Sequence, residues 1–169
     1  SGTTLPGAFL AYKTYGRLNE KKDNVILYPT AFGDTHAQNE WLIGSGKALD
    51  PDKYFIIVPN LLGNGLSSSP SNMPAPCDRS RFPRVSVYDN VAFQYRLIRE
   101  KFGIDRIALV VGWSMGGIQA FQWGASYPEA VERIAPFGGI AKPWPHTFVV
   151  LDSLKAALLS AVGFDPDRL

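Results

Sequence analysis

The sequence has a single cysteine in 169 residues, Cys77, and no apolar run near the roughly 20 residues that a membrane-spanning helix needs. A lone cysteine excludes an internal disulfide framework and every metal site built from several cysteines. The N-terminal SGTTLPG has neither the basic region nor the apolar core of a secretory signal. We therefore expect a cytoplasmic protein without a membrane segment or a metal, and we assign no role to Cys77.

Charge of one sign is also scarce. The 17 basic and 15 acidic residues are interspersed, which leaves a net charge of only +2. A surface that binds nucleic acid or an anionic membrane would require a basic patch, and no stretch of the sequence supplies one. Apolar residues, in contrast, make up 46% of the chain, which is enough for one globular domain or much of one.

Short apolar runs alternate with helical patterns along the chain. Ser86 and Asp89 have the spacing of a helix capping box, and Gly103 gives a stop signal after the helical pattern. The expected strands cover residues 8–16, 24–30, 54–60, 106–112 and 131–137, and the expected helices cover residues 86–102, 114–127 and 151–162. This alternation predicts the α/β class, a mostly parallel sheet with helices on both faces.

The segment LVVGWSMGGIQ, residues 109–119, places Ser114 between an expected interior strand and a helix. Gly112 to Gly116 fits G-x-S-x-G, the nucleophile elbow, in which a sharp turn exposes the serine oxygen beyond the carboxyl end of a strand. The turn would also place the N–H of Met115 at the positive end of a helix, where it can stabilise an oxyanion. The alternative is a glycine-rich turn in which Ser114 only caps the helix. The flanking strand and helix favour the nucleophile.

A second oxyanion donor would have to come from the loop after an earlier interior strand. VILYPTAFGD, residues 25–34, is such a strand and loop, and the small residues Thr30 and Ala31 would let the backbone approach a substrate. The alternative is an ordinary connecting loop.

Another glycine-containing loop, PNLLGNGLSSSP, spans residues 59–70 and has Gly63 and Gly65 after a strand, as a dinucleotide-binding fingerprint does. Ser68 replaces the third glycine, however, and no helical pattern begins there. The loop therefore disfavours nucleotide binding.

Several segments in chain order resemble one enzyme family. They are GDTHAQNEWLIGSGKALDPDKYFIIVPNLLGNGLSSSP, FPRVSVYDNVAFQYRLI, GWSMGG and QAFQWGASYPEAVERI. Together they resemble the homoserine O-acetyltransferase branch of the α/β-hydrolase fold, from about Leu5 to the 150s. The resemblance implies that Ser114 is the acyl-accepting nucleophile and that the N–H groups of Ala31 and Met115 form the oxyanion hole. It places His36, in GDTH, at a loop position and not at the catalytic histidine.

The chain departs from this family beside the nucleophile and in the last helix. The acetyltransferases read GGSMGG, whereas here Trp113 puts an indole next to the serine. Lys155 stands where the family has an arginine that holds the substrate carboxylate, and Leu151 or a neighbour stands where it has an asparagine. Lysine keeps the charge but lacks the bidentate fork. Phe32, Trp113 and Lys155 are the candidate substrate contacts, and the alternative for Lys155 is the exposed face of an amphipathic lid helix.

The order of the remaining candidate residues does not complete a triad. Catalytic residues of this fold follow in the order Ser, Asp or Glu, then His. His146, in the proline-rich AKPWPHTF, is the only histidine after Ser114, and the later Asp152, Asp165 and Asp167 come in the wrong order. We expect His146 to be a polar surface residue. Residues 1–142 would form the N-terminal part of the hydrolase core and residues 143–169 the start of a lid, with the triad Asp and His supplied by a C-terminal segment or a second chain.

The function favoured by these patterns is serine-dependent acyl transfer through an acyl-enzyme on Ser114, with hydrolysis of short-chain acetyl esters preferred. The first alternative is transfer of acetyl from acetyl-CoA to an alcohol, as in homoserine O-acetyltransferases. The second, from another class, is a noncatalytic binding protein with the hydrolase fold. The expected partner is a small ester or alcohol, with a homodimer as a further option. No cofactor is expected to be bound permanently, and acetyl-CoA would be a co-substrate only of a transferase.

Overall fold

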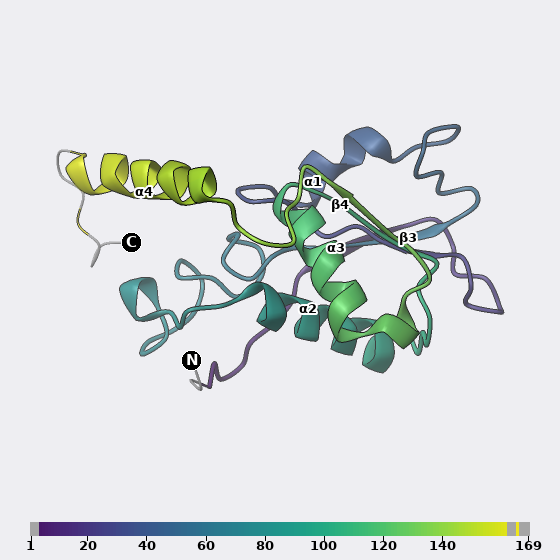
Figure 1. Cartoon of the computed structure of the whole chain (residues 1–169). Coiled ribbons are helices and arrows are strands. Elements are labelled where there is room, and N and C mark those ends of the chain that lie inside the picture. The colour runs from purple at the N-terminus through teal and green to yellow at the C-terminus, as the bar shows by residue number, and fades with distance from the viewer. Residues whose placement is uncertain (1–3, 162–164, 166–169) are drawn as a thin grey trace.

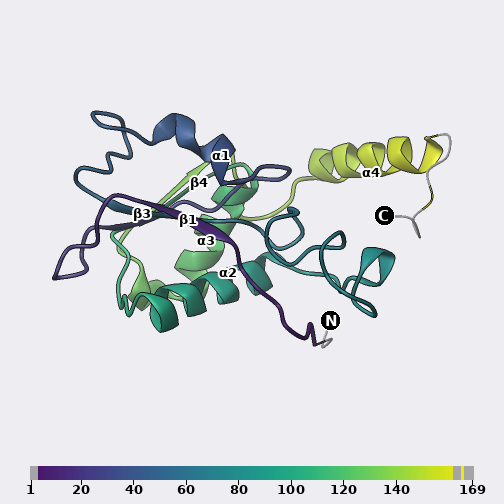
Figure 2. The same cartoon turned by 180° about the vertical axis from the view of Figure 1, so that it is seen from behind.

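Five strands form one sheet within residues 4–161 and 165, the part of the chain that the computed structural model describes (Figures 1 and 2). The sheet order is β1-β3-β2-β4-β5, with β1 Tyr12–Tyr15, β2 Val25–Leu27, β3 Phe55–Pro59, β4 Leu109–Trp113 and β5 Ile134–Phe137. β1 runs antiparallel to β3, and the other neighbouring strands run parallel. The prediction of a mostly parallel α/β sheet is confirmed.

Helices cover both faces of this sheet, as predicted. On one face lie α2 (Val87–Arg96), its π-helical continuation η3 (Leu97–Lys101) and α3 (Met115–Ser126), and on the other lie α1 (His36–Asn39) and the 3-10 helix η1 (Glu40–Leu42) (Figures 1 and 2). Further 3-10 turns are η2 (Arg79–Arg81) and η4 (Pro128–Ala130). Because successive strand residues point to opposite faces, each interior strand contributes to two cores. The first core includes Leu27, Ile57, Val91 and Trp123, and the second includes Ile26, Ile56, Ile43 and Leu49.

The element boundaries differ from prediction where side chains replace backbone partners. β1 begins at Tyr12 and not at residue 8, because the N–H groups of Phe9 and Ala11 donate to the hydroxyls of Ser68 and Ser67 at 2.9 and 3.0 Å. The predicted capping box at the start of α2 is present: Ser86 Oγ accepts from Asp89 N–H at 3.2 Å, and the Asp89 carboxylate accepts from Ser86 N–H at 2.7 Å.

The last helix, α4, covers Pro145–Ser160 and stands apart from the sheet and from α2 and α3 (Figures 1 and 2). It begins at Pro145 and not at residue 151, because proline fits the first helical turn, where its missing N–H needs no partner. Its predicted end at residue 162 lies outside the described residues. None of its residues is buried. Of the helices in the described part of the chain, none is long and apolar enough to cross a membrane.

Candidate active site

Ser114 lies at the carboxyl end of β4, in the turn that leads into α3. Its backbone has φ +51° and ψ −117°, a conformation that is strained for a residue with a side chain. The turn is fixed on both sides, because Ser114 N–H donates to Phe137 O at 2.8 Å and Ser114 O accepts from Ile118 N–H at 3.1 Å. The Ser114 side chain makes no capping hydrogen bond to α3, which argues against a role as a simple helix cap.

The glycines around Ser114 are required by close backbone contacts. A Cβ atom on Gly112 would lie 2.2 Å from Gly116 O, and one on Gly116 would lie 2.7 Å from Pro29 O. A Cβ atom on Gly117 would lie 3.1 Å from the Cα atom of Gly139. Gly116 and Gly117 of α3 therefore pass so close to β4, to the loop after β2 and to the segment after β5 that neither position has room for a side chain.

The loop after β2 lies against this first turn of α3. Thr30 is fully buried, and its N–H and Oγ1 bond to the end of β3 through Pro59 O at 3.3 Å and Leu61 N–H at 3.1 Å. Ala31 is 6% exposed, whereas the next residue, Phe32, is 76% exposed. The chain therefore passes from the interior to the surface directly after the candidate oxyanion residue.

Phe32 and Met115 line the same cavity, of about 450 Å³, which lies beside the elbow. Its wall is mainly apolar. The other lining residues are Gly33 in the loop after β2, together with residues of the loop after β3 and of the start of α2: Leu61, Leu62, Gly63, Asn64, Val85, Ser86, Val87 and Asn90. The volume is in the range of small-molecule sites. The wall from residues 61–64 was missed in the sequence, although its position after the parallel strand β3 was the signal.

The loop that contains Gly63 and Gly65 folds as turns, with φ +91° at both glycines, and no helix begins there. Leu62 N–H in this loop donates to Asn90 Oδ1 at 2.8 Å, which ties the cavity wall to α2. Within the described residues no helix begins directly after this loop, so the loop does not lead into the helix N-terminus that holds the phosphates in a dinucleotide site.

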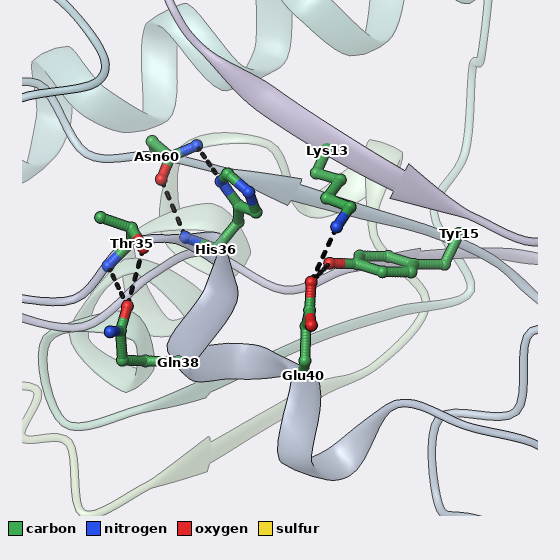
Figure 3. Close-up of polar contacts among 7 residues, drawn as sticks. All are labelled: Lys13, Tyr15, Thr35, His36, Gln38, Glu40 and Asn60. Atoms are coloured by element: carbon green, nitrogen blue, oxygen red, sulfur yellow. Dashed lines mark hydrogen bonds and ion pairs between the residues drawn. The ribbon is translucent and has the colours of Figure 1, made fainter.

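His36 is held by a side chain at the end of β3 (Figure 3). Asn60 Oδ1 accepts from His36 N–H at 2.9 Å, and Asn60 Nδ2 lies 3.2 Å from His36 Nδ1. Thr35 N–H and Oγ1 both donate to Gln38 Oε1, at 2.9 and 2.7 Å. These bonds fix α1 directly after the Ala31 loop, and they account for His36 without a catalytic task.

Glu40, at the start of η1 directly after α1, is held by an ion pair and a hydrogen bond from β1 (Figure 3). Glu40 Oε1 accepts from Lys13 Nζ at 2.8 Å and from Tyr15 Oη at 2.7 Å. The bond from Lys13 and then the bond from Tyr15 lower the pKa of Glu40, because both stabilise the carboxylate. Burial, and then the neighbouring Glu40 carboxylate, raise the pKa of the Tyr15 hydroxyl. The pair anchors η1 to β1.

Trp113 and Lys155 are not brought to the cavity lined by Phe32 and Met115. Trp113 is 57% exposed and lines a separate apolar cavity of about 170 Å³ with Tyr28, Trp41, Leu42, Val111, Gly112 and Phe137. Lys155 is exposed on α4. The alternative for Lys155, an exposed position, is what the structure shows, but α4 is not amphipathic, because large apolar side chains surround it: Phe148, Val149, Val150, Leu151, Leu154, Leu158 and Leu159.

The other titratable candidates lie at the surface or outside the described part. His146 is exposed in the first turn of α4, as predicted, and Asp152 is exposed on the same helix. Asp167 lies outside the described residues. Cys77 is a half-buried free thiol. In the part of the chain that the structure describes, no three His, Cys, Asp or Glu side chains gather as metal ligands would.

A mostly parallel sheet whose strand-to-helix turn presents a serine between glycines defines the class of α/β hydrolases. Residues 24–160 match the family model of the α/β hydrolase fold, and the chain therefore belongs to this family.

Three relatives are similar over most of the chain. It is 44% identical to a probable esterase of Corynebacterium glutamicum over 97% of the chain and 48% of the relative. It is 42% identical to the ethyl acetate hydrolase of Pseudomonas veronii over 98% of the chain and 46% of the relative. With the homoserine O-acetyltransferase of Thermobifida fusca it shares 43% identity over 79% of the chain and 39% of the relative.

The structure is similar to that of the acetyl esterase MekB, with a TM-score of 0.94 and 41% identity over 96% of this chain and 48% of that one. The chain thus spans about half the length of the esterases it matches. The resemblance to the acetyltransferase and esterase branch of the fold is confirmed.

Proposed function

We propose that this chain carries the nucleophile of a serine esterase that hydrolyses short-chain acetyl esters through an acyl-enzyme on Ser114. The observation that carries the proposal is the strained turn at Ser114, which is flanked by Gly112 in β4 and by Gly116 and Gly117 at the start of α3. Such strain persists only where the surrounding structure enforces it, and it clusters at catalytic nucleophiles. The small apolar cavity beside Met115 suits a small ester.

In the first half-reaction, Ser114 Oγ attacks the carbonyl carbon of the ester while a histidine base accepts the hydroxyl proton. That histidine, with its Asp partner, comes from a C-terminal segment or a second chain. The N–H groups of Ala31 and Met115 donate to the oxyanion of the tetrahedral intermediate. Met115 is the first residue of α3, where N–H groups have no partner within the helix.

Collapse of the intermediate breaks the bond to the leaving alcohol, which takes the proton from the histidine. Water then attacks the acetyl-enzyme with the same histidine as base, and acetate leaves Ser114 protonated as before. No permanently bound cofactor takes part in these steps.

Hydrolysis is favoured over transfer by two observations. Over almost the whole chain, the esterase relatives are 44% and 42% identical, whereas a homoserine O-acetyltransferase that matches 98% of the chain is 37% identical. Lys155, which the family resemblance places at the position of a carboxylate-binding arginine, is exposed on α4. An alcohol acceptor without a bidentate anchor has less binding energy with which to compete against water.

Transfer of acetyl from acetyl-CoA to homoserine or a similar alcohol is the second candidate, because one relative is 43% identical and is named for that reaction. A noncatalytic binding protein is the third. The cytoplasmic location and the homodimer stay predictions.

The test uses the intact protein, meaning this chain with the segment or chain that completes its triad. It is given an acetate ester or acetyl-CoA, with and without homoserine, and free acetate is measured against O-acetylhomoserine. Free acetate in excess supports the esterase, and O-acetylhomoserine in excess at modest homoserine concentration overturns it in favour of the transferase. An organophosphonate should label the wild-type protein and should not label Ser114→Ala. If the wild-type protein shows neither labelling nor turnover, the noncatalytic binding protein becomes the supported function.

A further inference from the structure

Two glutamines and a tryptophan, all fully buried, form a hydrogen-bonded chain between α2 and α3. Trp123 Nε1 donates to Gln94 Oε1 at 2.8 Å, and Gln94 Nε2 donates to Gln119 Oε1 at 2.6 Å. Gln119 Nε2 then donates to the backbone oxygen of Thr30 at 3.0 Å. Burial of an amide costs free energy unless the amide is hydrogen-bonded. If these positions only had to fill space between the helices, aliphatic side chains would serve equally well.

The direction of this chain is fixed by its two ends. The indole N–H of Trp123 can only donate, so it must meet the oxygen of Gln94. The carbonyl of Thr30 can only accept, so it must meet the nitrogen of Gln119. The bond between the two amides is then the one remaining arrangement, and each amide is held in a single orientation.

The acceptor at the end of the chain belongs to the peptide unit between Thr30 and Ala31. In a trans peptide the C=O and the N–H point in opposite directions, so a donor that fixes the oxygen also sets the direction of the N–H. That N–H is the one assigned to the oxyanion hole through Ala31. Gln119 Nε2 also lies 3.3 Å from Met115 O, one helical turn before it, and so bridges the segments of both oxyanion donors.

We propose that Gln119 is a positioning residue of the oxyanion hole, held in orientation by Gln94 and Trp123. This inference rests on the proposed acyl-enzyme chemistry at Ser114. Oxyanion donors are effective because they are already oriented when charge develops on the substrate oxygen. The side chain and the N–H of Thr30 are fixed by β3, and Gln119 fixes the carbonyl that those bonds leave free to rotate.

The test compares Gln119→Met with Gln122→Met in the intact protein. Methionine has nearly the length of glutamine and no amide donor. Gln122 lies on the same helix, and its amide donates within that helix, to Ser126 Oγ at 2.7 Å. We expect Gln119→Met to lower kcat for an acetyl ester roughly 10- to 100-fold, less than or equal to the loss of a whole oxyanion donor, with KM changed less than about twofold. Gln122→Met should leave both constants within about twofold.

A second readout separates positioning from general loss of structure. In a thionoester the developing charge lies on sulfur, which is larger than oxygen and a weak acceptor, so oriented N–H donors contribute little to its reaction. Gln119→Met should therefore lower the rate with the oxoester much more than the rate with the matching thionoester. An equal fall in rate with both substrates, or a rise in KM with kcat unchanged, would overturn the proposal.

Gln94→Met provides an independent variant if Gln119→Met does not fold. It should also lower the ratio of the oxoester rate to the thionoester rate. The decrease should be smaller than in Gln119→Met, because Gln119 keeps its donor and loses only its fixed orientation. Where both fold, the double variant should lose no more than Gln119→Met alone, since the two residues act through one bond to Thr30. An unchanged ratio in Gln94→Met or additive losses would overturn it. If Ser114→Ala stays active, the proposed function fails; if it is inactive while Gln119→Met matches Gln122→Met, only this inference fails.

Discussion

A Cβ atom on Gly116 would lie 2.7 Å from the carbonyl oxygen of Pro29, so the loop that carries Ala31 rests directly on the first turn of α3. This contact joins two segments that are far apart in the sequence. It sets the spacing between the nucleophile turn and the candidate oxyanion loop without a side chain between them. The elbow therefore depends on absent side chains as much as on Ser114.

Gly116→Ala should separate these two segments. We expect a loss of about 1–3 kcal/mol in the free energy of unfolding, because the methyl group must displace backbone, and a large fall in ester hydrolysis. Gly124→Ala is the matched control on the same helix, where a Cβ atom would lie at an ordinary 3.4 Å from Ile134 Cδ1. It should be neutral or stabilising by up to about 1 kcal/mol, from helix propensity. Urea unfolding and activity of the intact protein measure both, and wild-type behaviour of Gly116→Ala would contradict the contact.

Ser114→Ala should abolish turnover and leave the fold intact. Deletion of an acyl-transfer serine lowers kcat on the order of 10⁶-fold. A variant that keeps a tenth of the activity would rule Ser114 out as the nucleophile.

Ser114→Gly separates the strain from the chemistry. It should be as inactive as Ser114→Ala but more stable, because glycine adopts φ +51° without the roughly 1–3 kcal/mol that a side chain costs there. The comparison is made by thermal unfolding of the two variants. Equal or lower stability of Ser114→Gly would show that the turn is not strained.

Acid should weaken the anchor between η1 and β1 through Glu40. The pKa of Glu40 is lowered in the fold from an ordinary value of 4.5, so its contribution to stability is fully present above about pH 4.5 and is lost as the pH falls through the folded pKa. The stability difference between wild type and Glu40→Gln should thus be largest near neutral pH and shrink below about pH 4. Because both partners are partly exposed, salt should reduce it. Melting temperatures from pH 3 to 7 test this, and a difference that is constant with pH would contradict it.

Local signals in the sequence predicted the parts of the fold and site that depend on neighbouring residues. The Ser86 and Asp89 capping box and the G-x-S-x-G turn are of this kind, and both positions are as predicted. Contacts between distant segments could not be predicted in this way. The hydroxyls of Ser68 and Ser67 accept from the N–H groups of residues 9 and 11, in place of a backbone partner. Gln94 can bond to Gln119 only when α2 and α3 pack together. The amphipathic pattern predicted around Lys155 was wrong because residues 148–150, which lie before the predicted start of the helix, add apolar side chains to its other sides.

The isolated chain, residues 1–169, should be inactive and should aggregate. Leu151, Leu154 and Leu158 form an exposed stripe on α4, and Phe137 is exposed on β5, beyond which the described residues supply no further strand. Apolar surfaces of this extent and open sheet edges both promote association. Each leucine gains about 1.5–3 kcal/mol when it is buried, so in the intact protein this stripe should be covered.

Replacing the three leucines tests that expectation in both directions. The triple change Leu151→Glu, Leu154→Glu and Leu158→Glu should raise the solubility of the isolated chain and lower the binding of an apolar fluorescent dye, and it should destabilise the intact protein. Lys155→Glu, on the same helix, is the control and should change neither solubility nor stability strongly. Because Lys155 is exposed, Lys155→Ala should also change kcat/KM for an acetyl ester less than about twofold. A soluble, active monomer of residues 1–169 would contradict the need for a covering partner, since it would turn over esters with α4 uncovered and with no base supplied from outside the chain.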